Sequence, residues 1–369
     1  MSALRELRVD LGERSYSIRI GAGSLTQAGA GISEASRARR FLLVSNERVY
    51  GLYGEKLVKA LQSQGYEVLV SLMPDGEQYK NMDEAMKIID RAIAWNLDRS
   101  GGAIALGGGV VGDLAGLVAS LVHRGIDFIQ LPTTLLAQVD SSVGGKVAVN
   151  HPRGKNLLGA FHQPRLVLID PLTLKTLEER EYRGGLGEAV KYGIACDAGF
   201  FGYLEEHVEQ VRAQDPECIE ELIYQACRIK AEVVEEDEQE ARHRMVLNLG
   251  HTFGHSLEML GEYQAFRHGE AVAMGTIAAA FMALEMGYLD QGQLNRIGLL
   301  YRALGLATRF PGYDPEEVYT GMMNDKKSSH NRLRFILPRG IGAYVVVEAP
   351  PRELVYRAIR QAQKYSPNY

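Results

Sequence analysis

The chain has 369 residues, of which 46% are hydrophobic and 24% are charged, a composition typical of a soluble globular enzyme. The length is sufficient for two domains with sizeable cores, and the composition excludes a mainly disordered protein. The net charge of -5 excludes a protein-wide basic surface for nucleic acid, and no apolar run reaches the ~20 residues that a membrane-spanning helix needs.

Two further features indicate the cellular compartment. Residues 1–10 carry four charged side chains and lack the apolar stretch of a secretory signal. The three cysteines, Cys196, Cys218 and Cys227, form no CxxC pair, so no disulfide framework is expected. We therefore expect a cytoplasmic protein that binds neither nucleic acid nor a membrane.

The first half of the chain alternates short β-rich runs with helical stretches. This alternation predicts βαβ units and a parallel sheet that is covered on both faces. Residues 8–20 have a period of two and predict a hairpin at the sheet edge. The predicted strands are 41–45, 67–71, 103–106, 127–131 and 166–170, and the predicted helices are 49–65, 81–96 and 113–122.

After residue 171 the predicted elements become long and helical. We therefore expect an α/β domain over residues 1–180 and a mostly helical domain over residues 181–369. The predicted helices are 200–213, 216–238, 251–260, 269–286, 290–304 and 351–365, and the predicted strand pair is 334–337 with 344–347.

A glycine-rich loop follows the strand predicted at 103–106. Its glycines match G-x-G-x-x-G at Gly107, Gly109 and Gly112, and the loop opens a predicted helix. Such a loop lets the backbone approach a pyrophosphate at the helix N-terminus. The acid expected about 20 residues further on would be Asp127, which begins a strand instead of ending one. The loop therefore predicts a dinucleotide site of unusual plan or a phosphate site of another kind.

A polar segment with several cations follows. Residues 138–146 place a carboxylate, two hydroxyls, a Gly-Gly pair and Lys146 close together, and Arg153 and Lys155 come soon after. These cations suit an anionic substrate or a phosphate, and the alternative is a solvated surface loop. We favour the functional interpretation, because polar side chains are concentrated here between two predicted strands.

The helical half contains candidate metal ligands. His251 and His255 are four residues apart and share a helix face, without the H-E-x-x-H pattern of zinc proteases. Glu188 and Lys191 lie three residues apart on another helix, where the alternative is a surface ion pair, and His268 begins a third helix. One glutamate and two histidines would leave coordination positions for substrate oxygens, as in catalytic zinc sites. Spacing alone leaves open whether a metal binds.

Seven sequence blocks together resemble the 3-dehydroquinate synthases, members of the sugar phosphate cyclase superfamily. The blocks occur in the order of that family and extend over nearly the whole chain, which makes the resemblance specific. They are DGEQYK at 75–80, GGGVVGD at 107–113, PTTLLAQVDSSVGGK at 132–146, GKNLLGAFHQP at 154–164, GGLGEAVKYG at 184–193, NLGHTFGH at 248–255 and HGEAVAMG at 268–275.

The resemblance implies a fold and a reaction. The fold would be an N-terminal Rossmann-like NAD domain and a C-terminal helical metal domain, with the active site between them. The reaction would convert 3-deoxy-D-arabino-heptulosonate 7-phosphate to 3-dehydroquinate and phosphate, a step of the shikimate pathway. It would proceed by transient oxidation by NAD, β-elimination of phosphate, re-reduction and intramolecular aldol closure. The enzyme would be a carbon-oxygen lyase and a homodimer.

The resemblance also implies site residues, carried over block by block. Zinc or cobalt would be held by Glu188, His251 and His268. The residues implied for NAD are Asp75, Glu77, Lys80, Gly108, Gly109, Val110, Asp113, Thr133, Thr134, Leu136, Lys155, Asn156, Thr176, Leu177 and Glu181. Those implied for substrate and catalysis are Asp140, Lys146, Lys191, Lys230, Glu240, Arg244, Asn248, His255, one of Lys326 and Lys327, and Arg124 from a neighbouring subunit.

One position departs from the family pattern, and several rival functions remain. Asn46 follows the strand predicted at 41–45 and replaces an aspartate that some relatives have there. The adenosine-side contact of NAD is therefore left open. A sister cyclase would act on an amino analogue or on sedoheptulose 7-phosphate. A metal-dependent polyol dehydrogenase would share the architecture but produce NADH, and a non-catalytic NAD or phosphate sensor would bind without turnover.

Overall fold

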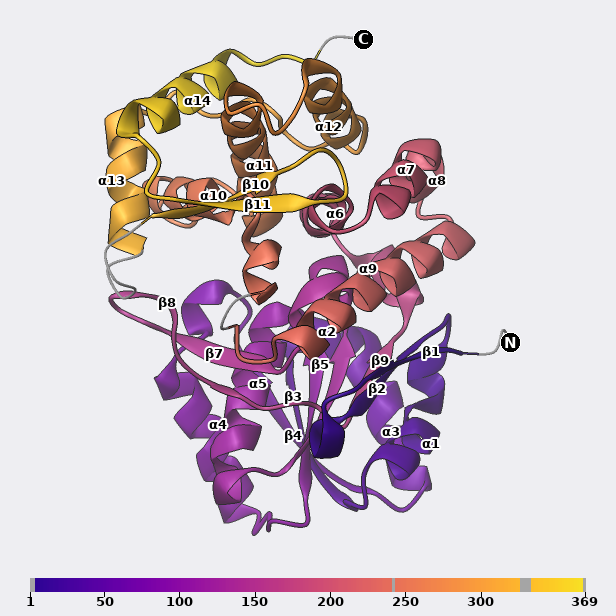
Figure 1. Ribbon diagram of the computed structural model, residues 1–369. Helices are drawn as coiled ribbons and strands as arrows, with labels where there is room; N and C mark the ends of the chain where they lie inside the picture. Colours follow the sequence, from indigo (N-terminus) through magenta and orange to yellow (C-terminus); the bar gives the residue numbers. More distant parts are fainter. Residues whose placement is uncertain (1–3, 241–242, 326–332, 368–369) are drawn as a thin grey trace. The chain divides into compact units, whose positions relative to one another are not determined.

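The computed structural model describes residues 4–240, 243–325 and 333–367 (Figure 1). The chain forms two compact units. Unit 1 comprises residues 1–177 and 219–239, and unit 2 comprises residues 178–218 and 240–369. Unit 1 therefore includes a second segment of the chain, which lies beyond residue 181. This segment contains most of helix α9 (Pro216–Glu236). The division into two continuous domains at residues 180 and 181 stays a prediction.

Unit 1 is built on a seven-stranded sheet with the strand order β1-β2-β9-β6-β5-β3-β4 (Figure 1). Neighbouring strands are parallel except for β1 and β2, which form the predicted antiparallel edge hairpin. The five other predicted strands are confirmed, with ends within two residues. The strands are β1 (Arg5–Val9), β2 (Tyr16–Ile20), β3 (Arg40–Asn46), β4 (Glu67–Met73), β5 (Gly102–Gly107), β6 (Asp127–Pro132) and β9 (Leu166–Ile169).

Helices cover both faces of this sheet, because successive strand residues point to opposite sides. In β3, Phe41 and Leu43 pack into the core that contains α1 and α3, whereas Leu42 and Val44 pack into the core that contains α4 and α5. The predicted helix at 49–65 is interrupted by a π-helical turn at Tyr50–Gly54. The helices are α1 (Ala28–Ala35), α2 (Glu47–Val49), α3 (Glu55–Ser63), α4 (Met82–Ala94) and α5 (Gly109–Leu121).

A second, two-stranded sheet in unit 1 was not predicted. Strands β7 (Lys146–His151) and β8 (Gly154–Phe161) form an antiparallel hairpin between the strands predicted at 127–131 and 166–170. Val147 and Val149 of β7 pack into the core beside α5. Strand β8 has low β-propensity, since it contains glycine and asparagine and no β-branched residue. The core contacts of β7 therefore position the hairpin.

Unit 2 is mostly helical, as predicted, and α11 is its central helix. Helix α11 is buried over most of its circumference and is packed against α6, α10, α12 and α14. The predicted helix at 200–213 is two helices that meet at His207, and α13 was not predicted. The elements are α6 (Glu179–Ala195), α7 (Ala198–Glu206), α8 (Val208–Arg212), α10 (His251–Leu260), α11 (His268–Glu285), α12 (Gln291–Ala303), α13 (Pro315–Asp325), β10 (Arg334–Pro338), β11 (Tyr344–Glu348) and α14 (Arg352–Lys364).

Each helix in the described ranges is too short or too polar to span a bilayer.

Candidate active site

Glycines let α6, α10 and α11 approach each other to backbone contact. A Cβ atom added at Gly269 would lie 1.8 Å from the carbonyl oxygen of Gly184, and one at Gly187 would lie 2.5 Å from that of Gly269. A Cβ added at Gly275 would lie 2.2 Å from the carbonyl oxygen of Gly250. Because these neighbours are backbone atoms that cannot swing aside, only glycine fits at the two crossings.

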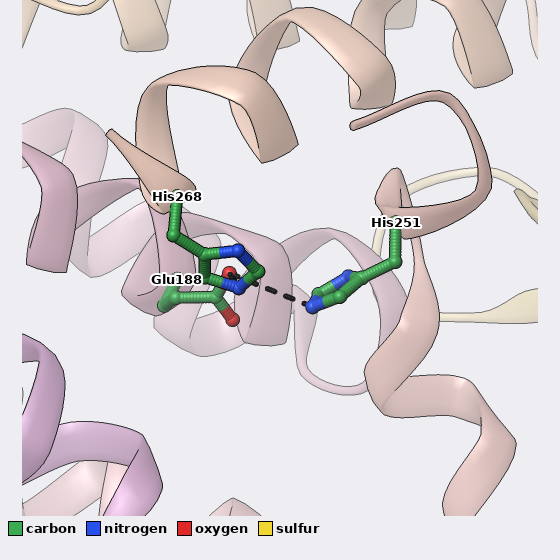
Figure 2. Close-up of side chains that lie close together, drawn as sticks. All are labelled: Glu188, His251 and His268. Atoms are coloured by element: carbon green, nitrogen blue, oxygen red, sulfur yellow. Dashed lines mark ion pairs between the residues drawn. The ribbon is translucent and has the colours of Figure 1, made fainter. Parts of the chain in front are cut away.

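The crossings bring three side chains together, because each is adjacent in sequence to one of these glycines. Glu188 follows Gly187 on α6, His251 begins α10, and His268 begins α11. One potential ligand atom from each lies within 4.8 Å of the other two. Figure 2 shows both imidazole rings near the Glu188 carboxylate, whose Oε1 lies 3.9 Å from His251 Nε2 and 3.6 Å from His268 Nε2.

The donor set fits a divalent metal ion. Glu188 is fully buried, and its Oε2 is paired with Lys191, whereas its Oε1 has no hydrogen-bond partner among the described residues. A buried carboxylate oxygen without a partner is costly, and a cation beside it removes that cost. Two imidazole nitrogens and one carboxylate oxygen are the protein ligands of many catalytic zinc sites.

The hydrogen bonds of the two rings favour the tautomer that binds a metal. His251 Nδ1 lies 3.2 Å from the carbonyl oxygen of Leu249, which can only accept a hydrogen bond, so Nδ1 carries the proton. His268 Nδ1 lies 3.1 Å from a carboxylate oxygen of Glu258. Burial, followed by nearby charges including Lys191, lowers the pKa of His251 well below its usual value. A neutral ring with a lone pair on Nε2 is the form that ligates.

The chain leading into α10, and α10 itself, carry four further predicted substrate residues: Glu240, Arg244, Asn248 and His255. Arg244 is 1% exposed, and Asn248 ends the short 3-10 helix His243–Asn248. The side-chain amide of Asn248 donates to Glu240 Oε1 at 3.2 Å. The ring centroid of His255 lies 5.3 Å from that of His251.

Predicted NAD residues of unit 1 gather around Lys80. The buried Lys80 ammonium lies 2.5 Å from Asp113 Oδ2 and donates to Asn156 Oδ1 at 2.7 Å. Burial lowers the pKa of Lys80, but the negative charges of Asp113 and Glu77 outweigh it, and the net pKa is raised. The lysine is therefore held charged.

Two asparagines hydrogen-bond to predicted NAD residues, and one of them, Asn150, joins the group around Lys80. Asn46 donates to Asp75 Oδ1 at 2.9 Å, and Asn150 donates to Glu77 Oε1 at 2.8 Å. The Asn150 side chain also accepts from the backbone N–H of Asn156 at 2.9 Å. Asn46 ends β3 and Asp75 follows β4, so these groups lie at the carboxyl edge of the sheet, where open α/β sheets bind ligands. Sequence reasoning did not identify Asn150.

The glycine loop has the predicted position, and the helix that it opens begins earlier than predicted. Helix α5 begins at Gly109, four residues before the predicted start, and no glycine of the G-x-G-x-x-G pattern has a positive φ. A Cβ added at Gly112 would lie 2.8 Å from Gln130 Oε1, and one at Gly108 would lie 2.9 Å from Thr134 Cγ2. The loop glycines therefore permit close packing against β6 and the segment after it.

The remaining residues implied for NAD lie in different surroundings. Thr134 accepts from the N–H of Ala137 at 3.2 Å, and Thr176 forms a 2.5 Å hydrogen bond with Tyr53. Glu181 lies on α6 of unit 2, where it forms a 2.7 Å ion pair with Arg267. Of the others, Thr133 is buried, Val110 packs against the sheet core, Leu136 is half-buried, Lys155 lies on β8 and Leu177 ends the first segment of unit 1.

The cations implied for the anionic substrate are only partly grouped. Lys230 on α9 lies 2.5 Å from Asp140 Oδ1 and donates to the Asp140 carbonyl oxygen at 2.6 Å. Lys146 is exposed at the start of β7, and Arg124 is exposed with a positive φ of 67° after α5. Lys326 and Lys327 lie outside the described residues.

Replacing Lys80 with methionine is expected to destabilise unit 1 and weaken NAD binding. The change leaves the Asp113 carboxylate without its ammonium, at a cost of about 3 kcal/mol for a largely buried pair. Urea unfolding and NAD titration would measure both effects. Lys59→Met is the control, since Lys59 is exposed on α3 and its replacement should change little. Equal behaviour of the two variants would contradict the role of Lys80.

Comparisons with known proteins agree with this architecture. Residues 70–184 match the family model for the 3-dehydroquinate synthase N-terminal region, and residues 185–328 match that for the C-terminal region. A 3-dehydroquinate synthase of Desulforamulus reducens is 48% identical over 337 residues, covering 91% of this chain and 94% of the relative.

Two solved structures are also similar. One is 2-epi-5-epi-valiolone synthase of Streptomyces hygroscopicus with NAD+ and Zn2+ bound, which has a TM-score of 0.87, 30% identity and 99% coverage of both chains. The other is 2-deoxy-scyllo-inosose synthase complexed with carbaglucose-6-phosphate, NAD+ and Co2+, which has a TM-score of 0.88, 26% identity and coverage of 97% of this chain and 99% of its own. The two family models match most of this chain, and the Desulforamulus reducens relative is 48% identical over 91% of it. The chain therefore belongs to the 3-dehydroquinate synthase family.

Proposed function

We propose that the chain converts 3-deoxy-D-arabino-heptulosonate 7-phosphate to 3-dehydroquinate and phosphate, as a phosphate-eliminating lyase of the shikimate pathway. The observation that carries this proposal is the Glu188 carboxylate oxygen facing two histidine Nε2 atoms. That site occurs in a chain with 48% identity to a 3-dehydroquinate synthase. The reaction has no net redox change, because the carbon oxidised at the start is reduced again before ring closure.

The metal would be zinc or cobalt, held by Glu188 Oε1 and the Nε2 atoms of His251 and His268. When bound, such an ion acts as a Lewis acid toward substrate oxygens. Lys191 holds the second carboxylate oxygen of Glu188, so Oε1 is the oxygen that remains for the ion. Glu188 would therefore be a monodentate ligand.

The dinucleotide would be NAD, bound by the Lys80 network and the α5 N-terminus. When bound, NAD supplies a reversible hydride acceptor for the substrate hydroxyl carbon. The charged Lys80 ammonium offsets the acidic side chains around it, and the N–H groups at the start of α5 suit a pyrophosphate. Asn46 already donates to Asp75, so we propose that Asp75 is the acidic group available on the adenosine side.

The cations of the site would bind the two anionic groups of the substrate. Charge-assisted hydrogen bonds hold carboxylates and phosphates firmly, and a substrate fixed in this way reacts intramolecularly in every later step. The elimination would use the substrate's own phosphate oxygen as base. The residues proposed for binding and orienting are Asp140, Lys146, Lys191, Lys230, Glu240, Arg244, Asn248, one of Lys326 and Lys327, and Arg124.

Replacing His255 with alanine is expected to retain metal and NAD while turnover falls by about 10²-fold or more, the usual contribution of a general acid-base group. His255 lies beside His251 but is not among the three metal ligands, so its proposed role is proton relay with water. Metal analysis, NAD titration and phosphate release would be measured together. Wild-type turnover would refute this role.

The choice between related cyclase activities is tested by a substrate panel. The protein would be offered 3-deoxy-D-arabino-heptulosonate 7-phosphate, its 4-amino-4-deoxy analogue and sedoheptulose 7-phosphate under equal conditions. We expect the first to have the highest kcat/KM. A preference for either of the others would replace the proposal with the corresponding sister activity, and binding without turnover of all three would favour a sensor.

We further propose a cytoplasmic homodimer in which Arg124 acts on the neighbouring subunit's substrate. Support comes from β8, which exposes Leu157, Leu158 and Phe161. Exposed apolar side chains on one short strand suit an interface between copies of the chain. The three cysteines are free thiols, which supports the location.

Mixed subunits test the role of Arg124. Arg124→Ala and His251→Ala would each be inactive alone, but a mixed dimer would contain one site with both native residues. Co-refolding equal amounts should restore about a quarter of the wild-type activity, because half the dimers are mixed and each has one intact site. No recovery in dimers shown to be mixed would place Arg124 in its own subunit's site.

A further inference from the structure

We propose that Glu258 is a positioning residue of the metal site, which orients His268 through a hydrogen bond to Nδ1. The residue lies on α10, seven positions after His251 and three after His255, so all three share one helix face. Sequence reasoning used the two histidines and missed the glutamate. The inference rests on the proposed function only in requiring a divalent ion.

Burial indicates that the Glu258 carboxylate has a defined role. Its residue is 3% exposed, and a buried carboxylate must be compensated by hydrogen bonds or opposite charge. One carboxylate oxygen lies 3.1 Å from His268 Nδ1. Since an ionised carboxylate can only accept, the hydrogen bond places the proton of a neutral His268 ring on Nδ1.

The tautomer matters because the other ring nitrogen faces the metal position. With Nδ1 protonated, the lone pair of His268 is on Nε2, 3.6 Å from Glu188 Oε1. A carboxylate behind a ligating imidazole fixes the ring orientation and makes the ligand more basic. In the corresponding place, Nδ1 of His251 lies 3.2 Å from a backbone carbonyl oxygen, that of Leu249.

The backbone at His268 is held by separate contacts, so the role assigned to Glu258 concerns the ring. Arg180 on α6 donates to both carboxylate oxygens of Glu270 at 2.8 Å and to the carbonyl oxygen of Ala265 at 2.9 Å. Glu270 also accepts from the backbone N–H of Arg267 at 2.9 Å. These contacts fix the first turn of α11 without involving Glu258.

A second metal site is the alternative. Ligand atoms of His255, Glu258 and His268 also lie within 4.8 Å of one another. The 3.1 Å separation between Glu258 and His268 is a hydrogen-bond distance, which uses the His268 nitrogen that a second ion would need. We therefore favour one ion and a positioning carboxylate.

The test is Co2+ binding to the metal-free full-length protein. Glu258→Gln and Glu258→Ala would be titrated with Co2+ against a chromophoric chelator, and the visible spectrum of bound Co2+ would be recorded. Glu262→Gln is the matched control, because Glu262 is an exposed acid just after α10. Removal of an outer carboxylate partner typically weakens metal binding 10- to 100-fold, so we expect about 10-fold for glutamine and about 100-fold for alanine.

The outcomes separate the alternatives. A shifted Co2+ spectrum with weaker binding in both Glu258 variants, with one ion per chain and an unchanged control, supports the positioning role. Wild-type affinity and spectrum would overturn it, as would lower stability without a change in metal binding. Two ions per wild-type chain and one in Glu258→Gln would make Glu258 a ligand instead. If Glu258→Ala prevents folding, the near-isosteric Glu258→Gln variant still decides the test. Because no turnover is measured, failure of the proposed function would not affect the result.

Discussion

Replacing Gly269 with alanine is expected to disrupt unit 2 and its metal site together. The added Cβ would lie 1.8 Å from the carbonyl oxygen of Gly184 and 2.9 Å from its Cα, so α6 and α11 would have to separate. Overpacking usually lowers the free energy of unfolding by about 1–3 kcal/mol. A clash between two backbones is expected to lower it further, by about 4 kcal/mol or more. That loss is comparable to the whole stability of many domains.

The measurement is urea unfolding followed by near-ultraviolet circular dichroism, with metal content determined in parallel. Gly202→Ala is the control, because an added Cβ there meets no atom of the described residues within 4 Å, and α7 continues on both sides. The control should be as stable as the wild type, or more stable by about 0.5–1 kcal/mol, because alanine favours the helix. Gly269→Ala with the wild-type midpoint and metal content would contradict the crossing.

Replacing His251 with alanine is expected to abolish metal retention and lower turnover by about 10³-fold or more. The variant removes one of the two imidazole ligands. A bound metal supplies several kcal/mol of transition-state stabilisation, and losing it corresponds to about a 10³-fold lower rate. The fold should persist, since His251 is in the first turn of α10 and its partner is a backbone carbonyl. Elemental analysis of dialysed protein and phosphate release would be measured on the same samples.

His151→Ala is the control for this variant, because His151 is exposed at the end of β7 in unit 1. It should retain the metal and the wild-type rate. Full metal occupancy in His251→Ala would show that another residue completes the site.

The fold was predictable where one periodicity dominated. Strand β5 is wholly buried and reads as a short apolar run, and α10 has the predicted bounds, His251–Leu260. The β7–β8 hairpin was not predictable, because Leu157 and Leu158 are exposed, and its pairing depends on the packing of β7. The membership of α9 in unit 1 depends on contacts distant in sequence, such as that of Lys230 with Asp140.

The candidate site was predictable in its residue types but not in its geometry. Glu188 and His268 are far apart in sequence and meet only because Gly187 and Gly269 allow backbone contact. The glycines before Glu188 form this crossing with α11, and the sequence pattern does not show which helix they meet. The spacing of Glu258, three residues after His255, places it on the same helix face. Spacing does not distinguish a buried glutamate from a solvated one, so the role of Glu258 was not predictable.

The measurement that tests the central claim most directly is product stoichiometry with 3-deoxy-D-arabino-heptulosonate 7-phosphate, NAD and zinc or cobalt. Phosphate would be quantified during turnover, 3-dehydroquinate identified by mass spectrometry and NADH followed by absorbance. We predict equal amounts of phosphate and 3-dehydroquinate, no accumulation of NADH, and loss of activity when either the metal or NAD is removed. Steady accumulation of NADH without phosphate release, or no reaction from folded protein with metal bound, would contradict the account.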